Sequence, residues 1–195
     1  MPIVPNVKLL YNSPLSLAVV AARKCTASKG DGMGEKDLGL LKSILNRGHT
    51  SVLEHISYTF EIPKLSRACL QEMSRHRISS PSVQSTRYTL SKLMDTEDLS
   101  SLLYKTIDED INKIALESLI KLQSLMRTRG IKNDVAKYAL PEAFITTMVW
   151  TINARSLSNF LSLRLKPGAL KEIRELAISI LDSIPKDHMI LYEGI

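Results

Sequence analysis

The sequence predicts an α+β fold in one domain, residues 1–195, with a mainly antiparallel sheet and several helices. Segments that alternate every second residue and segments with helical periodicity both recur along the chain. They do not follow one another in the regular strand–helix–strand order of a parallel α/β protein. At 195 residues, with 44% hydrophobic content, the chain is also long enough to bury a substantial core.

The first third of the chain is expected to contain one strand and two helices. Residues 3–11 form the predicted strand. Ser13 can cap the first helix, and Pro14 suits its first turn. A second helix is predicted over 35–47, where leucines recur at helical spacing. The glycines between the two helices follow a helix rather than a strand, so we expect a connecting loop and no phosphate-binding loop.

The middle of the chain should contain a strand, a short helix and a loop. A strand is predicted over 56–62, where Ile, Tyr and Phe alternate with other residues, and Pro63 should end it. A short helix over 65–74 then carries residues 75–77 at its C-terminal end, where positive charge is favourable. The Ser-Ser-Pro sequence at 79–81 should break this helix and form a loop.

One long helix near 100–129 is the largest element expected in the second half, because Leu and Ile recur there at helical spacing. A short segment over 133–138 follows it. Residues 144–152 are rich in Thr, Val and aromatic residues and are predicted to form a strand. Two helices, over 157–164 and 169–184, complete the chain.

The composition narrows the class of protein. A formal charge of +6 favours anionic ligands, while an aromatic content of 5% argues against binding of single strands by base stacking. No apolar run is long enough to span a membrane, and the N-terminus lacks a signal-peptide pattern. We therefore expect a cytoplasmic protein with no membrane partner. Cys25 and Cys69 are far apart, as expected of unpaired thiols in a reducing compartment.

Residues 75–88 form the most informative stretch of the chain. These fourteen residues include three arginines, a histidine, a glutamine and five Ser or Thr residues, with no acid. Arginine and protonated histidine are charged donors, and the hydroxyl and amide groups add neutral ones, so the set suits an anion such as a nucleotide phosphate. A solvated basic loop is the alternative that composition alone leaves open.

Three separated sequence blocks stand out by their order and spacing. Arg75-His76-Arg77 is followed by seven residues, then Ser85 and, two further on, Arg87. Residues 48–55 read Gly-His-Thr-Ser-Val-Leu-Glu-His, and residues 153–164 are rich in Asn, Arg and Ser. Together these blocks resemble the signature, the Gly-His-x-Ser/Thr-x-x-Glu-His segment and the C-terminal block of the flavin-dependent thymidylate synthases.

The resemblance implies reductive methylation of dUMP to dTMP, with methylenetetrahydrofolate as the carbon donor and NADPH as the reductant of a bound FAD. It also implies a homotetramer with active sites shared between subunits. A catalytically inactive relative that binds flavin and nucleotide is one alternative. A basic nucleic-acid-binding protein is a more remote one, and we expect no nucleic-acid partner.

The resemblance further implies roles for individual residues. The residues implied in catalysis are Arg164, which would polarise the uracil ring, and His49. Contacts with FAD are implied for Ser51, Arg75, His76, Arg77, Asn153, Arg155 and Asn159. Contacts with the substrate are implied for Glu72, Arg75, Gln84, Ser85, Thr86, Arg87, Lys137 and Arg164.

Four positions depart from the pattern common in that family. Glu72 stands where many members have Gln, and Val83 replaces a frequent acid. Lys137 replaces an Arg and keeps the charge without the planar fork, and Gly168 replaces a His. These departures concern contacts with the uracil and the phosphate rather than the class of reaction.

The helix expected after Asn153 places its polar residues on two faces. At about 100° per residue, Arg155 and Asn159 lie about 40° apart, whereas Arg164 lies about 180° from Arg155. In a continuous helix the two arginines cannot serve one pocket on a single side. Either the helix ends within a site, or its two faces contribute to different sites.

The histidines and cysteines do not suggest metal or thiol chemistry. His49, His55 and His76 lack the Cys or acid spacing that would complete a zinc site, so no metal is expected. Neither Cys25 nor Cys69 lies in the Pro-Cys motif of the classical thymidylate synthases. A flavin-dependent route without a cysteine nucleophile therefore suits this sequence better.

Overall fold

A four-stranded antiparallel sheet forms the centre of the computed structural model, which describes residues 6–30 and 34–195. The strand order is β1-β2-β4-β3, so both edge strands lie beside long central ones. The expected α+β class with a mainly antiparallel sheet is confirmed. The strands are β1 (Lys8–Asn12), β2 (Ser57–Ser66), β3 (Ser79–Val83) and β4 (Ile145–Asn153).

The two central strands form where the sequence alternates. Tyr58 and Phe60 of β2 and Trp150 of β4 are buried on one face, whereas Thr59 and Thr151 lie on the other and are partly exposed. Phe60 and Trp150 are direct partners across the two strands, with ring centroids 6.3 Å apart. Burial of one face therefore fixes the register, since a slip of one residue would expose these rings.

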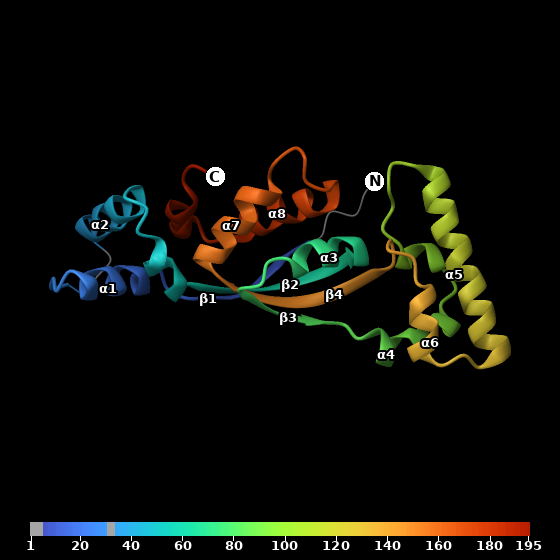
Figure 1. Ribbon diagram of the computed structural model, residues 1–195. Coiled ribbons are helices and arrows are strands. Elements are labelled where there is room, and N and C mark those ends of the chain that lie inside the picture. Colours follow the sequence, from blue (N-terminus) through green and yellow to red (C-terminus); the bar gives the residue numbers. More distant parts are fainter. Residues whose placement is uncertain (1–5, 31–33) are drawn as a thin grey trace.

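Helices cover one face of the sheet and both of its ends. Figure 1 shows α3, α7 and α8 over a single face, with α1 and α2 at one end and α5 and α6 at the other. The helices are α1 (Ser16–Cys25), α2 (Glu35–Asn46), α3 (Arg67–Ser74), α4 (Thr86–Thr89), α5 (Glu109–Arg129), α6 (Asn133–Ala136), α7 (Ala154–Arg164) and α8 (Lys171–Ser183). The 3-10 helices are η1 (Thr50–His55), η2 (Leu90–Asp95), η3 (Leu99–Leu102), η4 (Lys137–Ala139) and η5 (Lys186–Tyr192).

The buried side chains form two hydrophobic cores. The large core lies between the sheet and its covering helices and contains Tyr58, Trp150 and Phe160. The small core lies at the α5 end of the molecule and is built mainly from leucines, such as Leu93 and Leu119. The covalent links between the two regions run through the segments that follow β3 and precede β4.

The structure corrects four predictions about individual elements. Ser13 does not cap α1, because its hydroxyl accepts from the Ser57 N–H at 3.1 Å. The strand predicted to end at Pro63 continues to Ser66 through a change of register, with Lys64 at φ +56°. Residues 79–81 are not a loop but part of the edge strand β3, where proline is tolerated because one side of the strand needs no partner.

The fourth correction concerns the long helix, which begins at Glu109 rather than near residue 100. Leu103 instead forms an isolated β-bridge with Phe144, and the Asp108 side chain accepts from the N–H groups of Asp110 and Ile111 to cap the helix. Of the strand predicted over residues 3–11, the part before residue 6 lies outside the described residues.

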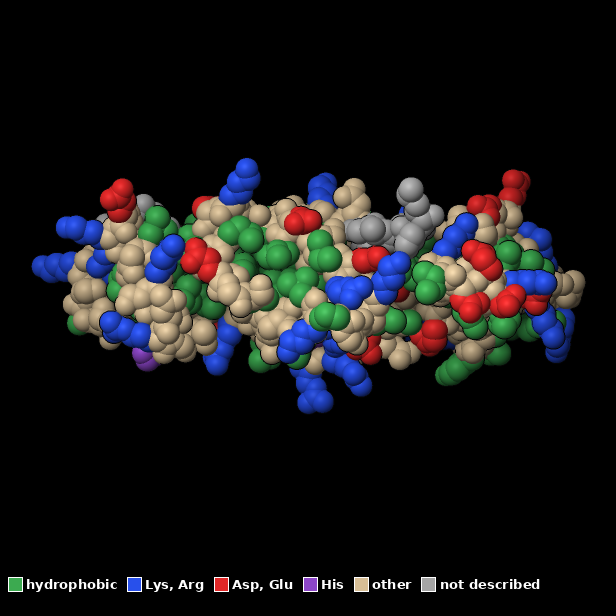
Figure 2. Space-filling view, turned by 90° about the horizontal axis from the view of Figure 1, so that it is seen from above, with side chains coloured by type: hydrophobic (Ala, Val, Ile, Leu, Met, Phe, Trp, Pro, Cys, Tyr) green, Lys and Arg blue, Asp and Glu red, His purple; other side chains and the backbone are tan. Residues whose placement is uncertain are grey.

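Charge is distributed unevenly over the surface. Figure 2 shows Lys and Arg side chains along the whole length of the molecule, with Asp and Glu side chains gathered toward the end that carries α5. Within residues 6–30 and 34–195, no helix is both long enough and apolar enough to cross a membrane.

Candidate active site

A cavity of about 580 Å³ lies between the segment after α3 and the first turns of α7. Its lining residues come from all three sequence blocks, which lie far apart along the chain and meet only in the fold. They are Glu54 of the first block, Arg75, His76, Arg77 and Ile78 of the second, and Asn153, Arg155, Ser156 and Asn159 of the third.

The start of α7 is fixed by two hydrogen bonds. The Asn153 side-chain oxygen accepts from the Ser156 N–H at 2.8 Å and caps the helix, and the Ala154 N–H donates to the Ile56 carbonyl at 2.7 Å. This anchor places Arg155 and Asn159 one turn apart on the same face, as expected from helical spacing, and both line the cavity.

Positive charge dominates the cavity. Three arginines line it against a single acid, Glu54, which accepts from Arg155 Nη1 at 2.5 Å. Both side chains of this pair are about half exposed, at 54% and 49%, so the pair orients Arg155 more than it stabilises the fold. Arg75, Arg77 and the two asparagines offer further donors, which suit a ligand with phosphate groups and hydrogen-bonding rings.

The last turn of α7 brings Arg164 to Glu72 of α3 and to His76, which follows α3, and we term these three residues the inner cluster. Arg164 Nη1 donates to the Glu72 carboxylate at 2.6 Å, Nη2 donates to the Glu72 carbonyl at 3.1 Å, and Nε donates to His76 Nε2 at 2.9 Å. Only 14% of the Arg164 side chain is exposed. These bonds use three of the five guanidinium N–H groups and leave two free, on a cation held in a defined orientation.

His76 joins the inner cluster to the cavity, because it lines the cavity and also contacts Arg164. Its ring packs edge-on against Phe160, with centroids 4.9 Å apart. Burial lowers the pKa of His76 below its usual 6.5, and the neighbouring Arg164 charge lowers it further. His76 is therefore neutral at pH 7, and since Nε2 accepts from Arg164, the proton is assigned to Nδ1.

Three other residues predicted to contact the substrate, Ser85, Arg87 and Lys137, lie apart from the inner cluster. Together with Asp134, which pairs with Arg87, we term them the outer cluster. Arg87 Nε donates to Asp134 at 2.7 Å, and the Arg87 carbonyl accepts from the Asn133 side chain at 2.7 Å. Asn133 thus joins α6 to α4. Within the described residues, no hydrogen bond or ion pair joins the outer cluster to the inner one.

Gln84 and Thr86, also predicted to contact the substrate, have other neighbours within the described residues. The Gln84 N–H donates to the Thr147 carbonyl at 2.9 Å, so this amide is already used within the sheet. The side chains of Gln84 and Thr86 line a separate cavity that Ser85 and Arg87 do not line. Their assignment to the substrate stays a prediction.

The first sequence block contributes in an unexpected way. His49 and Ser51, the residues predicted from it, are exposed and do not line the cavity, whereas Glu54 in the same 3-10 helix does. Glu54, Ile78 and Ser156 line the cavity but were missed by the residue-level prediction. Glu54 lies in the quoted motif, and the three-residue spacing from Ser51 was the signal that could have identified it.

The thiols lie in contrasting environments. Cys69 is fully buried, and burial raises the pKa of its thiol well above the usual value, so it is held as a neutral core residue. Cys25 is exposed at the end of α1. In the part of the chain that the structure describes, no three His, Cys, Asp or Glu residues are grouped as metal ligands would be.

Comparison with known proteins gives a consistent result. The family model described as thymidylate synthase complementing protein matches residues 8–188. The chain is 43% identical over 199 residues to the flavin-dependent thymidylate synthase of Campylobacter jejuni, covering 96% of each chain. It is 45% identical over 198 residues to that of Wolinella succinogenes, covering 96% of this chain and 97% of the relative.

A solved structure is also similar over nearly the whole fold. Thymidylate Synthase X from Helicobacter pylori, crystallised with FAD and dUMP, aligns with a TM-score of 0.89 and 39% identity. The alignment covers 97% of both chains.

Proposed function

The chain belongs to the flavin-dependent thymidylate synthase family, and on that premise we propose that it converts dUMP to dTMP in the cytoplasm. FAD is the bound cofactor, with methylenetetrahydrofolate as the carbon donor and NADPH as the reductant. The main observation that supports this function is that residues from three distant sequence blocks line one cationic cavity. FAD supplies the hydride chemistry when bound, so the protein has to bind, orient and stabilise charge.

Arg75, Arg77 and Arg155 supply the charge that holds FAD in the cavity of about 580 Å³. Their guanidinium groups donate to its phosphates, while the Asn153 and Asn159 amides provide neutral donors and acceptors for the rest of the cofactor. The remaining residues assigned to this role are His76, on the cavity wall, and Ser51, in the same 3-10 helix as Glu54. His49 lies at the start of that helix, where we propose a catalytic role near the flavin.

Arg164 is the residue that we propose acts on the uracil ring. Its two free N–H groups can donate to a ring carbonyl, and its charge favours the anionic ring that forms as the nitrogen loses its proton. Three hydrogen bonds orient the guanidinium before the substrate arrives, so little reorganisation is required during the reaction. Glu72 and Arg75, beside Arg164, complete this end of the dUMP site.

The outer cluster binds the phosphate end of dUMP through Arg87, Ser85 and Lys137. Since it lies apart from the inner cluster within one chain, we propose that each active site combines the inner cluster of one subunit with the outer cluster of another. This requires a homo-oligomer, and we propose the tetramer. The sheet face opposite α3, α7 and α8 supports it, because Figure 1 shows no described helix over that face and Val149 on it is 38% exposed.

Two measurements test the function itself. The purified protein should release flavin on denaturation and should form dTMP from dUMP when methylenetetrahydrofolate and NADPH are supplied. Flavin release without dTMP would identify an inactive relative. Absence of flavin together with binding of nucleic acid would favour the basic nucleic-acid-binding alternative.

Subunit mixing tests the shared site. Arg164→Ala removes the inner cluster's cation and Arg87→Ala removes that of the outer cluster, so each variant alone should be nearly inactive at low dUMP. After subunit exchange in an equal mixture, about a quarter of the sites should regain both arginines and activity should return to about that fraction. If mixing restores no activity although subunits have exchanged, each site lies within one chain.

A further inference from the structure

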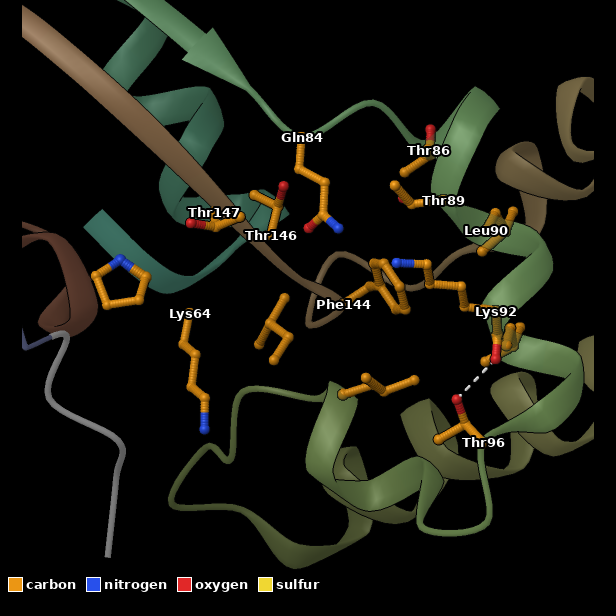
Figure 3. Close-up of a pocket in the computed structure, with 14 residues that line it drawn as sticks. Lys64, Gln84, Thr86, Thr89, Leu90, Lys92, Thr96, Phe144, Thr146 and Thr147 are labelled. Carbon is orange, nitrogen blue, oxygen red and sulfur yellow. Dashed lines mark hydrogen bonds between the residues drawn. The ribbon is translucent and has the colours of Figure 1, made fainter. Parts of the chain in front are cut away.

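A second cavity lies on the reverse side of the segment that carries Ser85 and Arg87. Its volume is about 270 Å³, and it is enclosed by the start of β4, the end of β2 and the segment formed by α4 and η2 (Figure 3). Neither the proposed FAD residues nor Arg164 line it. Of the residues predicted to contact the substrate, Gln84 and Thr86 line it, so it lies beside the outer cluster and apart from the FAD cavity.

The cavity has the polar groups of an anion site. Lys64 and Lys92 are among its lining residues, which include no Asp or Glu. Figure 3 shows the Gln84 amide and the Lys92 ammonium pointing into the same space from opposite sides. Within the described residues, neither of these side-chain groups has a hydrogen-bond partner, so both are available to a ligand.

Thr146 adds a hydroxyl group to the polar lining of the cavity. Only 7% of this residue is exposed, and its hydroxyl has no hydrogen-bond partner among the described residues. By contrast, the hydroxyls of Thr89, Thr96 and Thr147 on the same cavity donate to backbone carbonyls. The Thr146 hydroxyl is therefore available to a ligand oxygen in the cavity.

The rest of the wall is apolar and includes one ring. Phe144 extends into the cavity in Figure 3, and Leu90, Leu93 and Leu102 add aliphatic surface. An aromatic face beside aliphatic side chains suits a flat ring. The volume is slightly below the range of about 300–1,000 Å³ usual for drug-sized ligands, so it suits one ring and one charged group.

We propose that this cavity binds a small molecule in which one planar ring carries a phosphate or a carboxylate. Lys92, Gln84 and Thr146 hold the anionic group, and the ring lies against Phe144. Because Gln84 and Thr86 alternate along the chain with Ser85 and Arg87, a bound molecule contacts the reverse side of the segment proposed to hold the dUMP phosphate. The cavity thus offers a place from which a metabolite could adjust substrate affinity.

Threonine-methyl NMR on the whole protein provides a direct test. Phenyl phosphate and benzoate carry the two candidate anions on the simplest ring. At least one should shift the methyl signals of Thr86, Thr89 and Thr146 saturably, with a Kd below about 1 mM, and leave those of Thr26 and Thr128 unchanged. Which of the two binds more tightly identifies phosphate or carboxylate. Benzyl alcohol and inorganic phosphate, each lacking one half of the ligand, should bind at least about tenfold more weakly.

Two variants with a matched control complete the test. Lys92→Met should weaken binding of the ring anion at least about tenfold, and Thr146→Val, which keeps the shape, should weaken it about threefold to tenfold. Lys121→Met removes an exposed lysine of α5 that does not line the cavity and should have no effect. Since Lys92 is exposed, its variant remains informative even if Thr146→Val fails to fold.

The proposal is overturned if neither ring anion gives a saturable shift, or if Lys92→Met binds as tightly as the unaltered protein. This outcome is independent of the enzymatic activity, because neither probe is a substrate. Formation of dTMP, measured separately, reports on the proposed function alone.

Discussion

The inner and outer clusters contain the same chemical pair, an arginine with a carboxylate, in two different environments. In the inner cluster the side chains of Arg164 and Glu72 are 14% and 28% exposed, and Arg164 makes three hydrogen bonds. In the outer cluster the side chains of Arg87 and Asp134 are 62% and 59% exposed. A partly buried cation is held for a specific contact, whereas an exposed one is screened and remains mobile until another molecule covers it.

The difference follows from the elements that carry each cluster. Glu72 and Arg164 lie near the C-terminal ends of α3 and α7, which pack against the sheet on the large core. Arg87 and Asp134 lie on α4 and α6, helices of four residues at the α5 end of the molecule (Figure 1). Within one chain the inner cluster is held by its own hydrogen bonds, whereas the outer cluster, on our proposal, is completed by another subunit.

Replacing Arg164 by lysine should have the largest effect, on the chemical step. Lysine keeps the charge but loses the planar fork that bonds Glu72 and His76, so it no longer directs two donors at the uracil. Single-turnover formation of dTMP should fall by roughly a hundredfold to a thousandfold, as when an oxyanion donor is lost. Binding of dUMP, titrated against the flavin signal, should weaken much less. If only affinity falls, Arg164 is a binding residue and the catalytic assignment is wrong.

Replacing Arg87 by alanine should produce the opposite pattern. Loss of a charged donor to the phosphate should weaken dUMP binding by about tenfold to a hundredfold, whereas the single-turnover rate at saturating dUMP should change little. The same titration and rate measurement apply to this variant. Arg129→Ala, an exposed arginine at the end of α5, is the matched control and should change neither quantity. Unaltered affinity in Arg87→Ala would remove the outer cluster from the substrate site.

Neutralising Glu72 should destabilise the fold more than neutralising Asp134, because the inner cluster is more buried than the outer one. Glu72→Gln weakens a charge-assisted bond to a largely buried guanidinium and should cost about 1 kcal/mol, or about 2–4 °C in Tm for a chain of this size. Asp134→Asn removes an exposed pair and should lower Tm by less than about 1 °C. Thermal unfolding followed by circular dichroism measures both. Equal effects would mean that the clusters do not differ in the way proposed.

The smallest effect should be on the pH dependence of stability, and it should come from the inner cluster, which contains a titrating histidine. The pKa of His76 is lowered in the folded state, chiefly by burial. Its contribution to the free energy of unfolding is therefore fully present above the usual pKa of 6.5. That contribution is lost as the pH falls through the lower folded pKa, because the unfolded chain takes up a proton first. Unfolding of the unaltered protein and of His76→Gln between pH 7.5 and 5.5 measures it.

His188 must be separated from this effect, because burial also lowers its pKa. His188 is present in both the unaltered protein and His76→Gln, so the difference in unfolding free energy between the two reports on His76 alone. The stability advantage of the unaltered protein over His76→Gln should shrink as the pH falls. A constant or growing difference would show that His76 is not held neutral by its surroundings.

The sequence alone determined the features that depend on local pattern. The alternation over residues 56–62 predicted one central strand, because burial of one sheet face requires every second residue to be apolar, and the Thr, Val and aromatic content of 144–152 predicted the other. Helical spacing predicted that Arg155 and Asn159 share a face, and both line the cavity. The three motifs identified the family because each is a short run of contiguous residues.

Only the tertiary structure decided what depends on contacts between distant segments. Residues 79–81 form a strand because their hydrogen bonds go to β4, about 70 residues further along the chain, where no local signal could indicate a partner. The long helix starts late because Leu103 pairs with Phe144. Arg164 meets Glu72 and His76 through sequence separations of 92 and 88 residues, so the packing of α7 beside α3 positions that guanidinium. A hydrophobic pattern specifies which face of an element is buried, but the neighbour that covers it is selected by packing of the whole chain.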